Sequence, residues 1–313
     1  MTKIALLSTS LTAILVTLLP AAPAQAQNDI SYVSPAGSGT LCTRTSPCAN
    51  FTTAHAATDA GGQINCLESG SYFGVTITKS ITIDCAGVAA TSRGIHIDGA
   101  DIVVKIRNLT FNASGGGAQG IDFRNGASLF VEQCKFEYYT TFPPFIGVRF
   151  RPAAAARLVI SETSFSHNGG GSVGGGIVIS PQSGGSARVS LSRVVVANNV
   201  FGIAADGTGS TAGINMTITD IVSTGNSQDG IIAVTPSGGA PIGVMVKNTQ
   251  TTNNAIGIRS IGPNVTVRVD GSSVIGNGTG LSFSGGGTLL TFGNNAVQSN
   301  GTNGAFSGSV GLQ

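Results

Sequence analysis

The chain has 313 residues, of which 46 are glycine and none is tryptophan, and its formal net charge is +2. Charged residues make up only 10% and hydrophobic residues 41%, the opposite of the balance that keeps a chain disordered. No basic stripe is present to neutralise a phosphate backbone, so the composition argues against a nucleic-acid partner. The length allows two domains, but an internal repeat overrides that expectation.

The first residues predict an export signal. Lys3 supplies a positive charge, residues 4–19 are mostly apolar, and the small residues of AQA at 24–26 suit cleavage. The apolar run is shorter than the roughly 20 residues that span a bilayer. We interpret residues 1–26 as a cleaved signal peptide, with an uncleaved anchor as the alternative. The mature protein is then expected in the periplasm or outside the cell, with no further membrane segment.

Export permits disulfides, and all five cysteines lie in the first half of the chain. Cys42 and Cys48 flank a short proline-containing loop, which predicts one bridge. Cys66 and Cys85 are 19 residues apart and could meet on adjacent layers, which predicts a second. Cys134 is then a free, buried thiol, although other pairings stay open because sequence does not fix connectivity. Without a C-x-x-C motif, and with three scattered histidines, no metal site is predicted.

Residues 93–305 contain a repeat in which a glycine followed by an apolar residue recurs every 23 to 29 residues. These glycines are Gly94, Gly120, Gly147, Gly176, Gly202, Gly230, Gly257 and Gly280, with a degenerate copy at Gly304. Between them apolar residues alternate with polar ones and the helical period is absent, which is typical of short strands. Each repeat ends in a polar turn with an asparagine column: Asn168, Asn199, Asn226, Asn254, Asn277 and Asn300. We interpret these asparagines as turn residues that tolerate left-handed backbone and hydrogen-bond locally.

A repeat this short cannot bury its own apolar side, so it must stack on its neighbours. Equivalent strands stacked about 4.8 Å apart form parallel sheets around a narrow core. The sequence therefore predicts an all-β fold, a parallel β-helix over residues 93–305. Residues 27–92 would form an N-terminal cap with the first coils, and residues 306–313 a tail. The strands align while the corners vary in length, so the loops are expected to carry the specific function.

The stretch NFTTAHAATDAGGQINCLESGSYFGVTITKSITID (residues 50–84) resembles the opening of secreted right-handed β-helix proteins of the pectate-lyase-like superfamily. In that pattern a capping helix precedes GG-x-I, a Gly-x-Tyr turn and a KSITID strand. Asn50 would N-cap the helix, and Gly61 and Gly62 would end it. The resemblance covers roughly residues 31–305. It implies a right-handed parallel β-helix with a short N-terminal capping helix, and it leaves the activity open, because the superfamily includes lyases, hydrolases, epimerases and proteins without a known reaction.

Most active-site motifs implied by this resemblance are missing. The chain has no adjacent aspartates followed by Gly-His-Gly, as in polygalacturonases, and no pectin-esterase-like Gln and Asp motifs. A lyase would need clustered calcium-binding carboxylates and a base arginine, and RFRPAAAAR (residues 149–157) matches that arginine motif poorly. Glycoside hydrolysis usually needs two carboxylates about 5–9 Å apart, for which only Asp98 and Asp122 are obvious candidates. We therefore predict no cofactor, with calcium reserved for a lyase-like function.

Charged residues concentrate on the strands that follow Gly94, Gly120 and Gly147: residues 93–162 carry 14 of the chain's 30 charged residues. If these strands stack in register, their apolar residues point inward and their charged residues outward. The outward residues form two columns, His96–Asp122–Arg149 and Asp98–Arg124–Arg151. The loop YYTTFPPFI before Gly147 borders this face and contributes Tyr138 and Tyr139.

Aromatic rings beside paired charges suit a sugar, because rings stack on its apolar face while charges bind hydroxyls or carboxylates. Opposite charges on neighbouring strands also stabilise a sheet without any ligand. The leading hypothesis is an exported β-helix protein that binds a glycan or another surface polymer without demonstrable catalysis. Three arginines facing two aspartates favour uronates. The alternatives are a polysaccharide lyase or glycoside hydrolase acting on uronate-containing polysaccharide, and a structural or adhesion module. The oligomeric state stays open.

Overall fold

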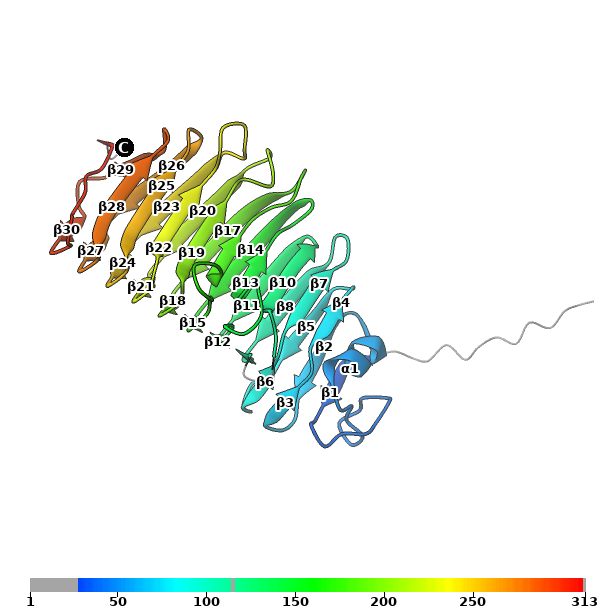
Figure 1. Cartoon of the computed structure of the whole chain (residues 1–313). Coiled ribbons are helices and arrows are strands. Elements are labelled where there is room, and N and C mark those ends of the chain that lie inside the picture. Colours follow the sequence, from blue (N-terminus) through cyan, green and yellow to red (C-terminus); the bar gives the residue numbers. More distant parts are fainter. Residues whose placement is uncertain (1–27, 114–115, 312–313) are drawn as a thin grey trace, which may run out of the picture.

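The computed structural model describes residues 28–113 and 116–311, so the predicted signal peptide, residues 1–26, lies outside the described residues. Within these ranges the chain winds into an elongated solenoid of stacked coils, which Figure 1 shows from the blue N-terminal end to the red C-terminal end. Each full coil contributes one strand to each of three long sheets, and neighbouring strands pair in parallel. The predicted all-β, parallel β-helix is therefore confirmed.

The three sheets run along the solenoid axis. Sheet A contains β1 (Asn28–Val33), β2 (Thr58–Cys66), β5 (Ile81–Asp84), β8 (Val103–Arg107), β11 (Ser128–Glu132), β14 (Ala155–Ser161), β17 (Ser186–Ser192), β20 (Ile214–Thr219), β23 (Ile242–Lys247), β26 (Val265–Asp270), β29 (Thr288–Thr291) and β31 (Gly308–Ser309). Sheet B contains β3 (Gly70–Tyr72), β6 (Ala90–Ser92), β9 (Thr110–Asn112), β12 (Lys135–Glu137), β15 (Ser164–Ser166), β18 (Val195–Ala197), β21 (Val222–Thr224), β24 (Gln250–Thr252), β27 (Ser273–Ile275) and β30 (Ala296–Gln298). Sheet C contains β4 (Val75–Ile77), β7 (Ile95–Asp98), β10 (Gln119–Asn125), β13 (Ile146–Phe150), β16 (Gly175–Ile179), β19 (Phe201–Asp206), β22 (Asp229–Val234), β25 (Ile256–Ile261) and β28 (Thr279–Ser284).

The core is built from columns of identical or similar apolar residues, one from each coil. Ile121 pairs in register with Ile95 on one side and Val148 on the other, and all three are fully buried. On sheet B the rings of Phe111 and Phe136 stack with centroids 4.5 Å apart. Alternation along each strand thus places the predicted inward residues in the core.

The repeated glycine marks the place where coils approach most closely. A Cβ atom on Gly120 would lie 2.6 Å from the carbonyl oxygen of Gly147 and 2.5 Å from the ring of Phe136. The next coil leaves no room for a side chain there, which explains the glycine-plus-apolar repeat. The degenerate copy at Gly304 forms no strand: sheet C ends at β28, and Thr302 meets Thr279 in an isolated bridge.

The predicted capping helix is present as α1 (Phe51–Ala57). The Asn50 side chain accepts a hydrogen bond of 2.9 Å from the Thr53 backbone N–H, and Phe51 is fully buried. The predicted end of the helix is wrong, because Gly61 and Gly62 lie within β2. The helix ends earlier, where Thr58 takes extended backbone, donates its hydroxyl to the Ala54 carbonyl at 2.6 Å and begins the pairing with β1.

The asparagine column forms a buried ladder, and its predicted backbone is wrong. The left-handed residue is the one before each ladder asparagine, as at Asn198 (φ 57°) and Gly225 (φ 66°). This corner turns the Asn226 side chain inward, where its Oδ1 accepts a 3.0 Å hydrogen bond from the Asn199 backbone N–H. Its Nδ2 reaches the Val196 carbonyl at 3.3 Å. The ladder therefore bonds from coil to coil, and Asn226 also donates to the Ser223 hydroxyl of its own coil at 3.1 Å.

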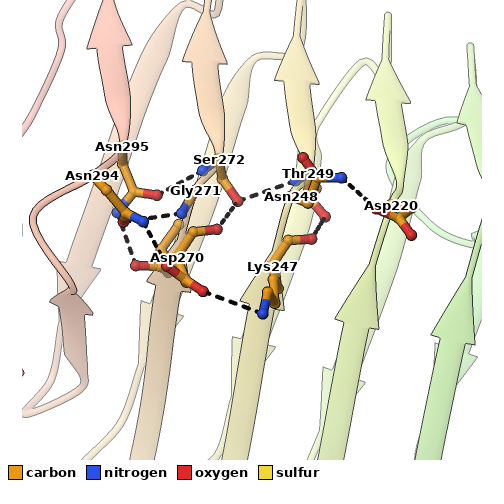
Figure 2. A network of polar contacts seen from close by, with 10 residues as sticks. Asp220, Lys247, Asn248, Thr249, Asp270, Gly271, Ser272, Asn294 and Asn295 are labelled. Carbon is orange, nitrogen blue, oxygen red and sulfur yellow. Dashed lines mark hydrogen bonds and ion pairs between the residues drawn. The ribbon is translucent and has the colours of Figure 1, made fainter. Parts of the chain in front are cut away.

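A second polar ladder follows the turn from sheet A into sheet B, and Figure 2 shows its C-terminal part. Asn294 donates to Asp270 at 2.7 Å, and Asn248 donates to Asp220. The Lys247 ammonium lies 3.8 Å from the same Asp270 carboxylate. Charged groups at this edge of sheet A thus have partners on the neighbouring coil.

Both predicted disulfides are present, Cys42–Cys48 and Cys66–Cys85, and both lie at the N-terminal end. Cys134 is free and 2% exposed. Burial raises the pKa of its thiol to about 12. Of the helices in the described residues, none is long and apolar enough to cross a membrane.

We expect replacement of one ladder asparagine, Asn226→Ala, to lower the free energy of unfolding by about 2–4 kcal/mol, because it leaves buried backbone groups of neighbouring coils without partners. Asn215→Ala is the matched control, since Asn215 is exposed on sheet A. Its effect should stay within about 0.5 kcal/mol. Urea denaturation followed by circular dichroism measures both. Equal effects would contradict the structural role of the ladder.

Cys134 should resist a maleimide reagent in the native protein and react once the protein unfolds, because its thiol is buried and its raised pKa disfavours the thiolate. Mass spectrometry of labelled peptides provides the readout. Fast labelling of the native protein, or a bridge mapped to Cys134, would show that the assignment is wrong.

Candidate functional site

The predicted charged residues lie on the outer face of sheet C, on β7, β10 and β13 and just after β13. Asp122 pairs in register with His96 on one side and Arg149 on the other, which confirms the first predicted column. The second column is wrong at its first member, because Asp98 pairs with Asn125. The register of β10 against β7 shifts between Phe123 and Asn125, so Arg124 has no opposite residue on β7.

Asp122 leaves the sheet on its outer face, yet its side chain is 0% exposed. Arg151 donates to both of its carboxylate oxygens, from Nε and Nη2, each at 2.8 Å. Arg124 donates from Nε at 2.7 Å, and Nδ1 of His96 lies 3.6 Å from Oδ2. Asp122 thus faces outward as predicted, but the cationic side chains beside it cover its carboxylate, so a ligand cannot contact it directly.

Electrostatics hold Asp122 in its charged form. Burial by itself would raise the pKa of this carboxyl, but interactions with Arg151, His96 and Arg124 outweigh burial and hold its pKa well below the usual range. A carboxylate that stays ionised and enclosed is a poor general base or acid near neutral pH. Its role in this cluster is to anchor the two arginines.

Arg149 differs from Arg124 and Arg151, the other two arginines beside Asp122. It is half-buried beside Asp122, and it makes no ion pair or hydrogen bond with another side chain in the part of the chain that the structure describes. Burial and the neighbouring Arg151 guanidinium lower the pKa of Arg149, but arginine remains cationic at physiological pH. The cluster therefore presents one cation that forms no ion pair with a carboxylate of the described residues.

A shallow depression of about 520 Å³ lies over the first residues of β4, β7 and β10. Its polar lining includes Thr52, Thr76, Arg93, His96 and Gln119. The side-chain oxygen of Gln119 is buried and lacks a hydrogen-bond partner among the described residues. His96 belongs both to this depression and to the Asp122 cluster, so the two are continuous.

The two tyrosines predicted to stack on a sugar are placed differently. Tyr139 is fully buried, and its hydroxyl donates to the Arg93 carbonyl at 3.0 Å. It occupies the asparagine-ladder position of its coil, where its backbone N–H donates to Asn168 at 3.3 Å, so its assignment as a stacking residue is wrong. Tyr138 is 48% exposed but stacks on His167 at the sheet B corner, with ring centroids 5.1 Å apart.

Other aromatic residues border the depression instead. Phe73 is 64% exposed, and the Arg93 guanidinium lies 5.7 Å from its ring centroid. Phe142 is 51% exposed and packs over Gly116, next to the segment that lines the depression. The loop of Phe142 is recognisable in the sequence, whereas Phe73 and Arg93 are not, because only the folded coil brings these corner residues to the face.

The described residues do not fit a metal centre. Nowhere in residues 28–113 and 116–311 do three or more His, Cys, Asp or Glu side chains come together as metal ligands. A lyase-like calcium site needs several carboxylate oxygens around one ion. We therefore derive no step that involves calcium.

Comparison with known proteins identifies one family. The family model described as "Right handed beta helix region" matches residues 62–297. A solved structure described as the crystal structure of pectate lyase Pel9A is similar at 15% sequence identity and a TM-score of 0.40, covering 84% of this chain and 67% of that chain. No curated protein matches. The family match confirms the right-handed β-helix that the sequence resemblance implied.

The enclosed carboxylate gives a stability prediction. Asp122→Asn should lower the free energy of unfolding at pH 7 by about 3–5 kcal/mol, because it leaves clustered cations without their counter-charge. Asp98→Asn is the matched control, since Asp98 is exposed and should change stability by less than about 0.5 kcal/mol.

The same carboxylate fixes a pH dependence. Its folded-state pKa lies below the unfolded value of about 3.9, so its stabilisation is complete above about pH 5 and is lost as the pH falls. Urea titrations from pH 3 to 7 should show a shallower acid decline for Asp122→Asn than for the wild type. Parallel curves would contradict the assignment of Asp122 as the anchor.

Proposed function

The chain belongs to the right-handed β-helix family, and from that premise we propose that it is an exported protein that binds a uronate-containing polysaccharide across sheet C. The observation that carries this proposal is Arg149, a half-buried cation with no carboxylate partner among the described side chains. A guanidinium binds a carboxylate through two parallel hydrogen bonds, which makes an anionic sugar its natural partner.

The surroundings of Arg149 support a sugar rather than a simple anion. His96 lies two strands away from Arg149, about 10 Å along the solenoid. It lines the depression over β4, β7 and β10. The Gln119 side chain belongs to the polar lining of this depression, and its amide can hydrogen-bond a sugar hydroxyl. Phe73 and Phe142 offer exposed rings for the apolar face of a sugar ring.

Binding without hydrolysis follows from the state of the carboxylates. A glycoside hydrolase needs two carboxyl groups that exchange protons or attack the sugar. Asp122 is enclosed by Arg124 and Arg151 and stays ionised, so it is unsuited to either role. Asp98 is exposed, and the charge that acts on it from this cluster is the Arg151 guanidinium.

A lyase is the second candidate, and one observation favours it. His96 is 41% exposed, lines the depression and has its Nδ1 directed to Asp122, an arrangement that orients a histidine as a base. Elimination from a uronate leaves a product with a C=C bond conjugated to the carboxylate, which absorbs at short ultraviolet wavelengths. Incubation of the protein with polygalacturonate tests this candidate, and an unchanged absorbance rules it out for that substrate.

Export is part of the proposal and has indirect support. Two disulfides are compatible with an oxidising compartment. The signal peptide itself stays a prediction from sequence. A polysaccharide outside the cytoplasm is the partner that this location and the sheet C face together suggest.

We expect Arg149→Ala to weaken binding of an oligogalacturonate by about 1–3 kcal/mol, the scale of a charge-assisted hydrogen bond, while leaving Tm nearly unchanged. Isothermal titration calorimetry and thermal unfolding measure the two effects. Arg193→Ala is the control, because Arg193 pairs with Glu162 at the turn from sheet A into sheet B and its side chain is 59% exposed. An unchanged affinity, or no binding by the wild type, would overturn the proposal.

A further inference from the structure

The outer face of sheet A carries a second concentration of positive charge. Arg157 on β14 pairs in register with Arg188 on β17, so the two side chains leave the same face one strand apart. Arg268 on β26 lies on this face as well, in the neighbouring column that passes through Thr217 and Met245. Both columns point to solvent, because they alternate with buried core residues.

None of these three arginines makes an ion pair with a described residue. The Arg157 guanidinium lies 5.9 Å from the Phe130 ring centroid, and no carboxylate stands opposite Arg188 or Arg268. Like charges directly opposite on neighbouring strands destabilise a sheet. The Arg157–Arg188 pair is therefore unfavourable for the isolated protein.

At the carboxyl ends of the sheet A strands, by contrast, the charged side chains are paired. There Arg107 binds Glu132 at 2.9 Å and Arg193 binds Glu162 at 2.9 Å. Lys247 faces Asp270, the pair visible in Figure 2. The cations at the strand ends thus have carboxylate partners on neighbouring coils. Arg157, Arg188 and Arg268, which lie within the strands, have no such partner among the described residues.

The unpaired arginines surround a hollow of about 400 Å³. Gly243 is one of its lining residues, and an added Cβ there would meet only Oδ1 of Asn215, at 3.4 Å. A side chain would therefore fit at this position and would occupy part of the hollow. The other polar lining residues are Arg157, Arg188, Ser190, Thr217 and Arg268.

We propose that this face of sheet A is a second binding site, for an anionic polysaccharide chain that lies along the solenoid axis. Carboxylate or sulfate groups of the chain bind Arg157 and Arg188 at one end of the hollow and Arg268 at the other. From β14 to β26 the face spans four strand spacings, about 19 Å, which requires a ligand with repeated anionic groups. The hydroxyls and amide between the arginines hydrogen-bond the sugar hydroxyls.

The lining favours a polysaccharide over other polyanions. Binding of single-stranded nucleic acid relies on aromatic side chains that stack on bases, and no aromatic residue lines this hollow. A duplex contact neutralises many phosphates, whereas only three arginines surround the hollow. The site does not depend on the sheet C proposal, because the two sites share no residue.

Calorimetry on the Arg149→Ala protein isolates sheet A, since that variant removes the cation proposed for sheet C. Two probes, an oligogalacturonate and a sulfated oligosaccharide of equal length, distinguish carboxylate from sulfate. A further Arg188→Gln substitution should weaken the better probe about tenfold or more. Gly243→Leu should weaken it similarly by filling the hollow without changing the charge, whereas Arg193→Gln should leave binding within about twofold.

The outcomes separate the two sites. If Arg149→Ala alone abolishes binding of both probes, the sheet A site is wrong and the sheet C proposal stands. If Arg188→Gln abolishes binding while Arg149→Ala has no effect, sheet A is supported and sheet C is wrong. Equal losses in Arg188→Gln and Arg193→Gln, or no effect of Gly243→Leu, would show charge attraction without a site. Tighter binding of duplex DNA or anionic vesicles, lost in Arg188→Gln, would overturn the choice of a polysaccharide.

Discussion

Hydrogen bonding between successive coils is the constraint on which the rest of the molecule depends. A single coil has one short strand per sheet and cannot bury its apolar residues, so each coil is stable only when it packs against its neighbours. The glycine column permits close approach, and the asparagine ladder satisfies the buried backbone groups at the corner. Once these contacts set the register, each outward position repeats at a fixed spacing along the axis. The two charged faces are consequences of that spacing.

The fold could be predicted because the register is written in the sequence. Glycine and isoleucine recur at the same points of each repeat, and their alternation assigns Ile121 to the core before any coordinates are known. The burial of Tyr139 could also be predicted from the repeat. Tyr139 stands three residues after Phe136, just as the ladder residue Asn168 stands three residues after Phe165. Its burial follows from the column and not from its chemistry. The helix end was harder, because pairing of Thr58 with β1 overrides the glycine signal.

The site could be predicted only in part, because several of its features depend on contacts between side chains of neighbouring strands, which the repeat does not specify. The column of His96, Asp122 and Arg149 follows from periodicity. The enclosure of Asp122 does not, since it depends on the directions that Arg124 and Arg151 take across the strands. The register shift that places Asp98 opposite Asn125 cannot be recognised from the sequence repeat. The hollow on sheet A is lined by Gly243, where a side chain would fit, and no sequence motif marks such an unfilled position.

The two ends of the solenoid are closed in different ways. At the N-terminal end α1 covers the first coil, the Cys66–Cys85 disulfide joins the ends of β2 and β5, and Cys42–Cys48 closes the loop between β1 and α1. At the other end β31 has only two residues, and both are exposed. In a one-dimensional stack the outermost unit has a single neighbour, so opening begins where that neighbour is held least. Mechanical or thermal opening of this protein therefore has a direction. It travels from the C-terminal coils toward the cross-linked end, and the charged face of β7 to β13 lies nearer to the end that opens last.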